Sequence, residues 1–398
     1  MRNRNVQDGA QSVYLLEYGR RKIKVCADTF QNLAQIFGEE AEEGDTQEQE
    51  RAFRLLKKRL AEGRQLFAGN LQELADMMNQ AAEESVRLIR LGGRRQRRLE
   101  KGLRQEGLEA RDIYLIRRGD GRMELSVLLS ARTKNSRTVE EAADYLSVLL
   151  DIRLISAKRN PFFIGREPVC YFFEEEPEYM YLTGTAKAVK ETEEISGDNF
   201  SFFEAGDGNL TAVLSDGMGS GREACQDSEA VTDMAESMLE SGVPPKMAAA
   251  LMNSAVANGG TGERLPTLDM CSIDLYEGEC LFLKTGAAAS FIKHGNRVEV
   301  IEGAALPLGA FGRIDPVLEK RSFSDGDYII LMTDGMLEGW AGGDGIARLS
   351  RFLSGTEASS PGQLANVLMK YSIERQRGRI RDDMTVLAVG LWKREETD

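Results

Sequence analysis

The 398-residue sequence contains a single histidine, His294, and this scarcity excludes several kinds of active site. A zinc site of the HExxH kind needs two histidines, and a Ser-His-Asp triad would have to use this one residue. His294 stands in the run Lys293-His294-Gly295-Asn296, which is typical of an exposed hairpin turn. The sequence also lacks the G-x-x-x-x-G-K-[ST] phosphate loop. Histidine chemistry and ATP binding through a P-loop are therefore not expected.

Long apolar runs are missing as well. No segment approaches the roughly 20 apolar residues that a membrane-spanning helix requires, and the N-terminal residues form no signal core. The five cysteines are odd in number and scattered, which indicates a reducing compartment. The formal net charge of -13 argues against a surface that binds nucleic acid. We expect a cytoplasmic protein with no nucleic-acid partner.

The chain is longer than one compact core usually requires, so it should contain several domains. We predict a helical regulatory and dimerisation region in residues 1–104, a small α+β module in residues 105–178, a larger domain in residues 179–392, and a tail in residues 393–398. An apolar column at every seventh position from Phe53 to Leu88 predicts a long amphipathic helix extending to about Leu91. This helix could pack within its own chain or form a homodimer.

The segment after this helix is basic, and the segments beyond it have the patterns of strands and helices. Gly92-Gly93 should end the helix, and the arginine-rich run of residues 94–104 is either a solvated face or a docking patch for an acidic partner. Residues 113–129 have the period-two pattern of a hairpin. From residue 179 the order is strands, a helical hairpin in residues 222–257, more strands, and a helix before a last strand. This order favours a layered sandwich of sheets flanked by helices.

Four acidic segments lie in the larger domain. Ser215-Asp216-Gly217-Met218 and Thr333-Asp334-Gly335-Met336 each follow an apolar run that reads as a strand. Ser196-Gly197-Asp198 precedes the first, and Asp382-Asp383-Met384-Thr385 precedes the closing strand. One Asp-Gly after a strand is most often a turn. Four together are typical of a site for a hard cation such as Mn2+ or Mg2+.

The motifs resemble those of the PPM-type metal-dependent serine/threonine phosphatases, and most closely the sporulation branch, the stage II sporulation protein E family. The segments that carry the resemblance are residues 215–221, 267–270, 284–287, 290–293, 306–309 and 382–385. The resemblance covers residues 180–392, and a looser one covers residues 27–30 with the long helix. It implies an α+β fold whose phosphatase domain, residues 179–392, is a four-layer α-β-β-α sandwich.

The resemblance also implies a site. Two ions, Mn2+ or Mg2+, would be held by Asp198, Asp216, the backbone carbonyl of Gly217, Asp334 and Asp382. Asp216 would bridge the ions, and Asp382 is preferred to Asp383 because it stands first in its motif. The four aspartates would be catalytic through metal-activated water, which needs no histidine base.

Two glycines and the nearby cations complete this set of expectations. Gly219 and Gly221 would leave room for the substrate, although Gly221 also fits a plain lead-in to a helix. The family's phosphate-binding arginine has no clear counterpart here, and Lys187 and Lys190 are the cations nearest to its place.

We therefore expect a metal-dependent protein phosphatase that dephosphorylates an anti-sigma factor antagonist and so activates a sporulation sigma factor. The resemblance further implies that the helical hairpin adjusts metal occupancy. The alternatives are a stress-response phosphatase with a different antagonist substrate, a catalytically inactive binding scaffold, and a hydrolase of small phosphate esters. Members of the branch carry a membrane region upstream, so this chain is either a soluble relative or the cytoplasmic portion of a membrane-anchored parent.

Overall fold

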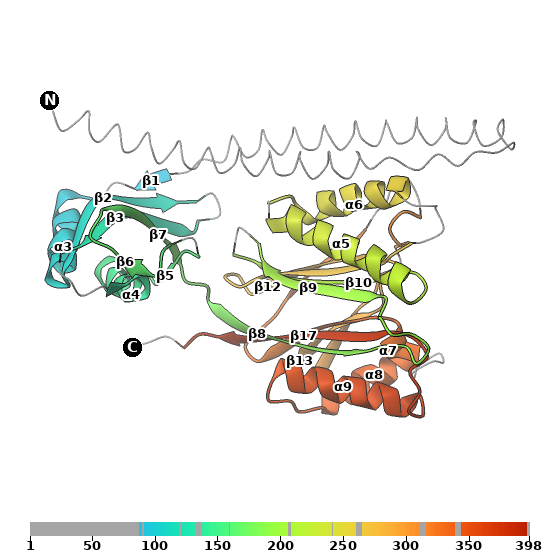
Figure 1. The fold of residues 1–398 in the computed structure, drawn as a ribbon. Helices are drawn as coiled ribbons and strands as arrows, with labels where there is room; N and C mark the ends of the chain where they lie inside the picture. The colour runs from blue at the N-terminus through green and yellow to red at the C-terminus, as the bar shows by residue number, and fades with distance from the viewer. Residues whose placement is uncertain are drawn as a thin grey trace, which may run out of the picture. The chain divides into compact units, whose positions relative to one another are not determined.

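A computed structural model describes residues 87–395, apart from residues 90, 119–120, 133–136, 159, 206–207, 241, 260–264, 304, 311–315 and 339–343. Contacts divide these residues after Glu176 into two compact units (Figure 1). Most of the expected long helix, with its proposed role in dimerisation, lies outside the described residues. At its end the prediction is wrong, because Arg87–Ile89 forms a strand, β1. Within the described ranges, no helix is both long enough and apolar enough to span a membrane.

The first unit is a five-stranded antiparallel sheet with the strand order β1-β2-β3-β7-β5. Its further elements are α3 (Gly93–Gln105), β2 (Leu108–Arg117), β3 (Met123–Ala131), β4 (Arg137–Thr138), α4 (Val139–Leu150), β5 (Leu154–Ser156), β6 (Phe163–Ile164) and β7 (Val169–Glu175). The predicted hairpin is confirmed as β2 and β3. Helix α4 begins at a capping box, in which Thr138 and Glu141 satisfy each other's backbone N–H groups.

Helix α3 carries the basic run on its solvent side. Leu99 and Leu103 are buried and face β2 and α4. The basic side chains are all exposed: Arg94, Arg95, Arg97, Arg98, Lys101 and Arg104. The basic run is therefore one face of a helix that packs into the first unit.

The second unit contains two five-stranded antiparallel sheets, with the orders β15-β12-β11-β10-β9 and β14-β13-β16-β17-β8. The first consists of β9 (Asp198–Glu204), β10 (Leu210–Asp216), β11 (Leu268–Asp274), β12 (Glu279–Thr285) and β15 (Val317–Ser322). The second consists of β8 (Tyr179–Ala188), β13 (Ser290–His294), β14 (Arg297–Ile301), β16 (Asp327–Met332) and β17 (Met384–Lys393). A shared apolar core, which includes Leu214, Phe282 and Leu331, joins the two sheets.

Helices pack on the sheets of this unit (Figure 1). Helices α5 (Arg222–Glu240) and α6 (Pro245–Gly259) form the predicted hairpin, and α5 packs on β9 and β10. Helices α8 (Gly345–Gly355) and α9 (Pro361–Arg375) cover the second sheet, while the short α7 (Gly335–Glu338) follows β16. The predicted α+β class is confirmed.

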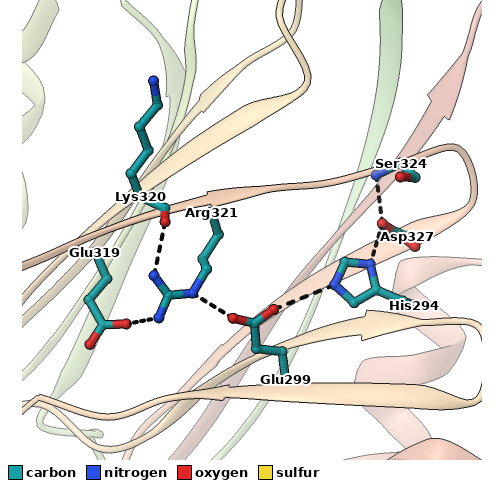
Figure 2. A network of polar contacts seen from close by, with 7 residues as sticks. All are labelled: His294, Glu299, Glu319, Lys320, Arg321, Ser324 and Asp327. Carbon is teal, nitrogen blue, oxygen red and sulfur yellow. Dashed lines mark hydrogen bonds and ion pairs between the residues drawn. The ribbon is translucent and has the colours of Figure 1, made fainter.

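The only histidine of the chain takes part in a polar network at one edge of this unit (Figure 2). His294 is half-buried rather than exposed, and its Nδ1 lies 2.6 Å from Asp327 Oδ2. Arg321 on β15 donates from Nε to Glu299 Oε1 on β14 at 2.5 Å, and it also pairs with Glu319. Because β14 and β15 belong to different sheets, Arg321 links the two sheets at this edge. These contacts indicate a structural role for His294.

Candidate metal centre

Two of the predicted aspartates lie opposite each other on neighbouring strands. Asp198 is the first residue of β9, Asp216 is the last residue of β10, and the antiparallel register makes their Cα atoms partners. Side chains at paired positions lie on the same face of a sheet, so the two carboxylates share a face. Asp334 follows β16 and Asp382 precedes β17, which are paired strands of the other sheet. Each sheet thus contributes two of the four aspartates.

Hydrogen bonds between the sheets bring these pairs to the same end of the unit. Asp198 is fully buried, and its Oδ2 accepts hydrogen bonds from Thr385 Oγ1 at 2.7 Å and from Thr333 Oγ1 at 3.0 Å. Thr333 directly precedes Asp334 in the chain. The other oxygen, Asp198 Oδ1, is buried and has no hydrogen-bond partner among the residues that the structure describes. A buried carboxylate oxygen without a partner is costly unless a cation or a donor meets it.

The pKa values of the clustered aspartates also favour a cation at this place. Burial raises the pKa of Asp198 to about 6. Burial, followed by the charges of Asp198 and Asp334, raises the pKa of Asp216 to about 9. The pKa of Asp382 is raised by burial and by Asp334. Carboxylates that hold protons because they are buried, and because they repel one another, are the arrangement that a divalent cation would stabilise.

The neighbouring Asp383 has a different environment from Asp382. It is buried, and its two oxygens accept hydrogen bonds from the backbone N–H of Lys190 at 2.9 Å and of Gly197 at 2.7 Å. Both oxygens are therefore occupied in holding the backbone at Lys190 and at Gly197, upstream of Asp198. Asp382, which is partly exposed, is the member of the pair that is better placed to hold a cation.

The glycines after Asp216 have separate structural requirements. A Cβ atom on Gly217 would lie 2.0 Å from the carbonyl oxygen of Ala224, so only glycine fits between the loop and α5. Gly219 has φ = 100° and Gly221 has φ = 77°, values that favour glycine. The space around Gly219 is open, whereas a Cβ atom on Gly221 would lie 2.7 Å from Glu193 Oε2. Gly219 thus fits the expected open approach better than Gly221 does.

These residues fit a hard cation in their chemistry but do not form a ready-made coordination group. In the described part of the chain, no three His, Cys, Asp or Glu side chains are close enough together to hold a metal ion as they stand. The case for a cation rests on the unpartnered Asp198 Oδ1, the mutual repulsion of the aspartates, and the all-oxygen donor set. The assignment of the metal ligands is therefore a proposal.

Sequence reasoning missed three residues of this region. Thr333 and Thr385 donate to Asp198, which only the pairing of β16 with β17 and the approach of the two sheets make evident. Glu338 has a pKa raised by burial and by the charges of Asp382 and Asp334. Its position four residues after Asp334, within one helical turn, is the signal that could have identified it.

A pocket adjoins the cluster within the same unit. Its lining comes from both sheets and consists of Leu214, Asp216, Thr267, Asp269, Gly286, Ala287, Ala288, Met332, Thr333 and Asp334. Two of the predicted metal ligands, Asp216 and Asp334, thus share a pocket with a third carboxylate, Asp269.

Comparison with known proteins identifies the domain that holds this site. Residues 206–392 match the family model described as stage II sporulation protein E. This domain belongs to the stage II sporulation protein E family. The chain is 30% identical over 347 residues to stage II sporulation protein E of Bacillus subtilis strain 168, covering 84% of this chain and 40% of the relative. It is 26% identical over 338 residues to the Priestia megaterium protein, covering 84% of this chain and 58% of the relative.

The fold agrees with this family. A solved structure of the PP2C phosphatase domain with a fragment of the regulatory domain of SpoIIE from Bacillus subtilis matches with a TM-score of 0.62 and 26% identity. The match covers 87% of this chain and 98% of that chain. The second unit therefore has the fold of the metal-dependent PP2C-type serine/threonine phosphatases. The chain spans about half the length of the curated SpoIIE proteins it matches.

Proposed function

We propose that this protein is a Mn2+- or Mg2+-dependent serine/threonine protein phosphatase. The observation that carries the proposal is the gathering of Asp198, Asp216, Asp334 and Asp382 at one end of the two sheets, with Asp198 Oδ1 buried and unpartnered among the described residues. Together with the Gly217 carbonyl, they would hold two ions. When bound, such ions supply a water nucleophile at neutral pH and neutralise charge on the transferred phosphoryl group.

The chain's own groups have distinct tasks in this proposal. Thr333 and Thr385 hold one oxygen of Asp198 so that the other faces the site. Asp383 holds the backbone at Gly197, and Thr267 fixes the backbone of Asp216 by accepting a hydrogen bond from its N–H at 2.9 Å. Gly219 leaves the loop above the site open to a substrate segment.

We further propose that the substrate is a phosphorylated anti-sigma factor antagonist, and that its dephosphorylation activates a sporulation sigma factor. Support comes from the family match and from the two sporulation proteins that the chain resembles. We place the protein in the cytoplasm, either alone or as the cytoplasmic portion of a membrane-anchored parent. In the same proposal, residues 1–104 regulate the phosphatase and mediate a homodimer, residues 105–178 form a regulatory module, residues 179–392 form the phosphatase, and residues 393–398 are a tail.

The helical hairpin is placed to influence the metal ligands. Ser228 on α5 donates from Oγ to the backbone oxygen of Gly197 at 2.5 Å, and it accepts a hydrogen bond from Asn199 Nδ2 at 2.9 Å. These two residues flank Asp198 on either side. A movement of α5 would therefore shift Asp198, and we propose that the hairpin adjusts metal occupancy in this way.

The test is release of phosphate from a phosphorylated anti-sigma factor antagonist with and without Mn2+, using Asp216→Asn as the control. We expect release that requires Mn2+ and is lost in the variant. A folded, Mn2+-binding protein that releases no phosphate would favour an inactive scaffold. Equal turnover of p-nitrophenyl phosphate and the phosphoprotein would favour a hydrolase of small esters, and preference for a stress-pathway antagonist would favour the stress-response alternative.

A further inference from the structure

A buried lysine pairs with Asp269 of the pocket wall and makes contacts that the proposed reaction does not explain. Lys284 is 0% exposed, and its Nζ lies 2.6 Å from Asp269 Oδ2 and 2.7 Å from Ser290 Oγ. Ser290 Oγ also donates to Asp269 Oδ2 at 2.6 Å. Asp269 is 1% exposed and Ser290 is 0% exposed. The three side chains form a closed polar triangle in the interior of the second unit.

This triangle connects the two sheets next to the proposed metal site. Asp269 on β11 is the register partner of Lys284 on β12, and Ser290 belongs to β13 of the other sheet. Asp269 is also the partner of Leu214, two residues before Asp216 on β10. The triangle therefore fixes the spacing of the sheets close to the point where their aspartates meet.

The aliphatic part of Lys284 is enclosed by the loop that follows β14. A Cβ atom placed on Gly303 would lie 2.8 Å from Cβ and 3.4 Å from Cδ of Lys284, so the loop backbone packs directly on the lysine stem. The ammonium group is thus held away from solvent and directed at Asp269. A buried lysine keeps its charge only when a partner compensates for lost hydration.

A short path leads from Asp269 to Asp216. Thr267 lies two residues before Asp269, and its Oγ1 accepts from the N–H of Asp216 at 2.9 Å. The Thr267 N–H donates to the carbonyl oxygen of Asp216 at 2.9 Å, and Ser215 Oγ donates to the carbonyl oxygen of Thr267 at 2.7 Å. Three hydrogen bonds thus fasten the chain at Asp216 to Thr267. Any shift of Asp269 along β11 would be passed to Asp216.

The cost of such a pair indicates that it does more than add stability. Replacing a buried ion pair by apolar or neutral groups of similar size is often neutral or stabilising, so stability alone explains it poorly. Asp269 also lines the pocket with Asp216 and Thr267, and its second oxygen, Oδ1, is buried with no hydrogen-bond partner among the described residues. The lysine therefore holds a carboxylate in a fixed orientation at the wall of the site.

We propose that Lys284 and Asp269 are positioning residues that set the place of Asp216 for cation binding, acting through Thr267. The inference rests on the proposed function in one respect, namely that Asp216 is a ligand of the cation. It predicts that the pair matters for metal affinity far more than for folding.

The test compares Mn2+ binding by calorimetric titration in the full chain and in matched variants, with urea unfolding in EDTA as the measure of stability. The double variant Asp269→Asn/Lys284→Met removes both charges and keeps the volumes similar. We expect it to stay folded and to bind Mn2+ at least tenfold more weakly. Lys293→Met is the control, because Lys293 is a buried lysine on β13 of the other sheet, and its Nζ donates to the Gly295 backbone. We expect wild-type binding from this control.

Thr267→Val provides a second variant, because it removes the oxygen that accepts from Asp216 while nearly conserving shape. We expect it to weaken Mn2+ binding as well. When Thr267→Val is combined with the double variant, the fold-loss of Mn2+ affinity should be smaller than the product of the two separate fold-losses, because both changes act on the same path. A merely structural pair would give independent, multiplicative effects. Wild-type affinity in Thr267→Val, or in a folded double variant, would overturn the inference even if the other variant failed to fold.

The outcomes separate this inference from the proposed function. If the wild type fails to bind Mn2+, or if Asp216→Asn binds it equally well, the metal site itself is wrong. If Mn2+ binding requires Asp216 but is indifferent to the Lys284 and Asp269 charges, only the positioning role is wrong.

Discussion

The protein without metal should lose stability as pH rises, because its aspartates keep protons in the folded state. The pKa of Asp216 is raised from its usual value of 3.8 to about 9, chiefly by burial and then by the charge of Asp198. Between these two values the folded chain binds more protons than the unfolded chain. The free energy of unfolding therefore falls as pH increases through this window, which is opposite in sign to a salt-bridged aspartate.

The magnitude follows from the same shift. One proton held in the folded state but released on unfolding costs about 1.4 kcal/mol per pH unit. From pH 5 to pH 8 this amounts to roughly 4 kcal/mol, a large part of the stability of a typical domain. Asp198, with a pKa of about 6, adds to the loss at the acidic end of the range. Asp216→Asn removes the titrating group and should flatten the dependence.

The assay is urea unfolding in EDTA at pH 5, 6, 7 and 8, with the wild type and Asp216→Asn compared at each value. Asp233→Asn, an exposed aspartate on α5, controls for removing a carboxylate. Groups far from the cluster are common to all three proteins and cancel in the difference. Asp216→Asn should become the more stable protein at pH 8. Equal pH slopes in the wild type and Asp216→Asn would refute the electrostatic account of the cluster.

Three further predictions concern groups around the cluster. Thr385→Val should raise the pKa of Asp198 further, because it deletes a hydrogen bond that lowers it, so Mn2+ binding measured by calorimetry should weaken more at pH 6 than at pH 8. Gly217→Ala should lower the free energy of unfolding by about 3 kcal/mol or more, through collision with the Ala224 backbone. Gly219→Ala has a strained φ but open space around the new methyl group, so it should lower the free energy of unfolding by only about 1 kcal/mol. Equal losses of stability in urea for Gly217→Ala and Gly219→Ala would contradict this reading. Lys190→Met should weaken Mn2+ binding more at acidic than at neutral pH, because the Lys190 charge lowers the pKa of Asp382. An unchanged pH dependence of Mn2+ binding would remove Lys190 from the site.

Much of the second unit could be predicted from its sequence because its elements have regular patterns. The helices α5 and α6, the strand β8 and the final strand β17 correspond to the expected segments. Strand β15 cannot be recognised from its sequence, because its three consecutive charged residues, Glu319, Lys320 and Arg321, resemble a solvated loop. The strand at Arg87–Ile89 was read as helix because Leu88 continues an apolar column with a period of seven. A local pattern cannot show that β2 offers this segment a strand partner.

The candidate site could likewise be predicted only in part from the sequence. The aspartates could be found because each stands in a short motif at the end of an apolar run. The support of Asp198 by Thr333 and Thr385 depends on the pairing of β16 with β17 and on the approach of the two sheets, which no single segment encodes. Lys284 and Ser290 stood in motifs that carried the family resemblance, yet the ionic contact with Asp269 became evident only from the register of β11 and β12.

The polar network in Figure 2 also has a consequence for behaviour at high concentration. Strands β14 and β15 are edge strands of their sheets, and an unprotected edge can pair with the edge of another molecule. Glu299 and Arg321 place linked charges on these two edges. An incoming strand would have to desolvate those charges and break the link between them. The network therefore disfavours pairing of another molecule's strand with these two edges.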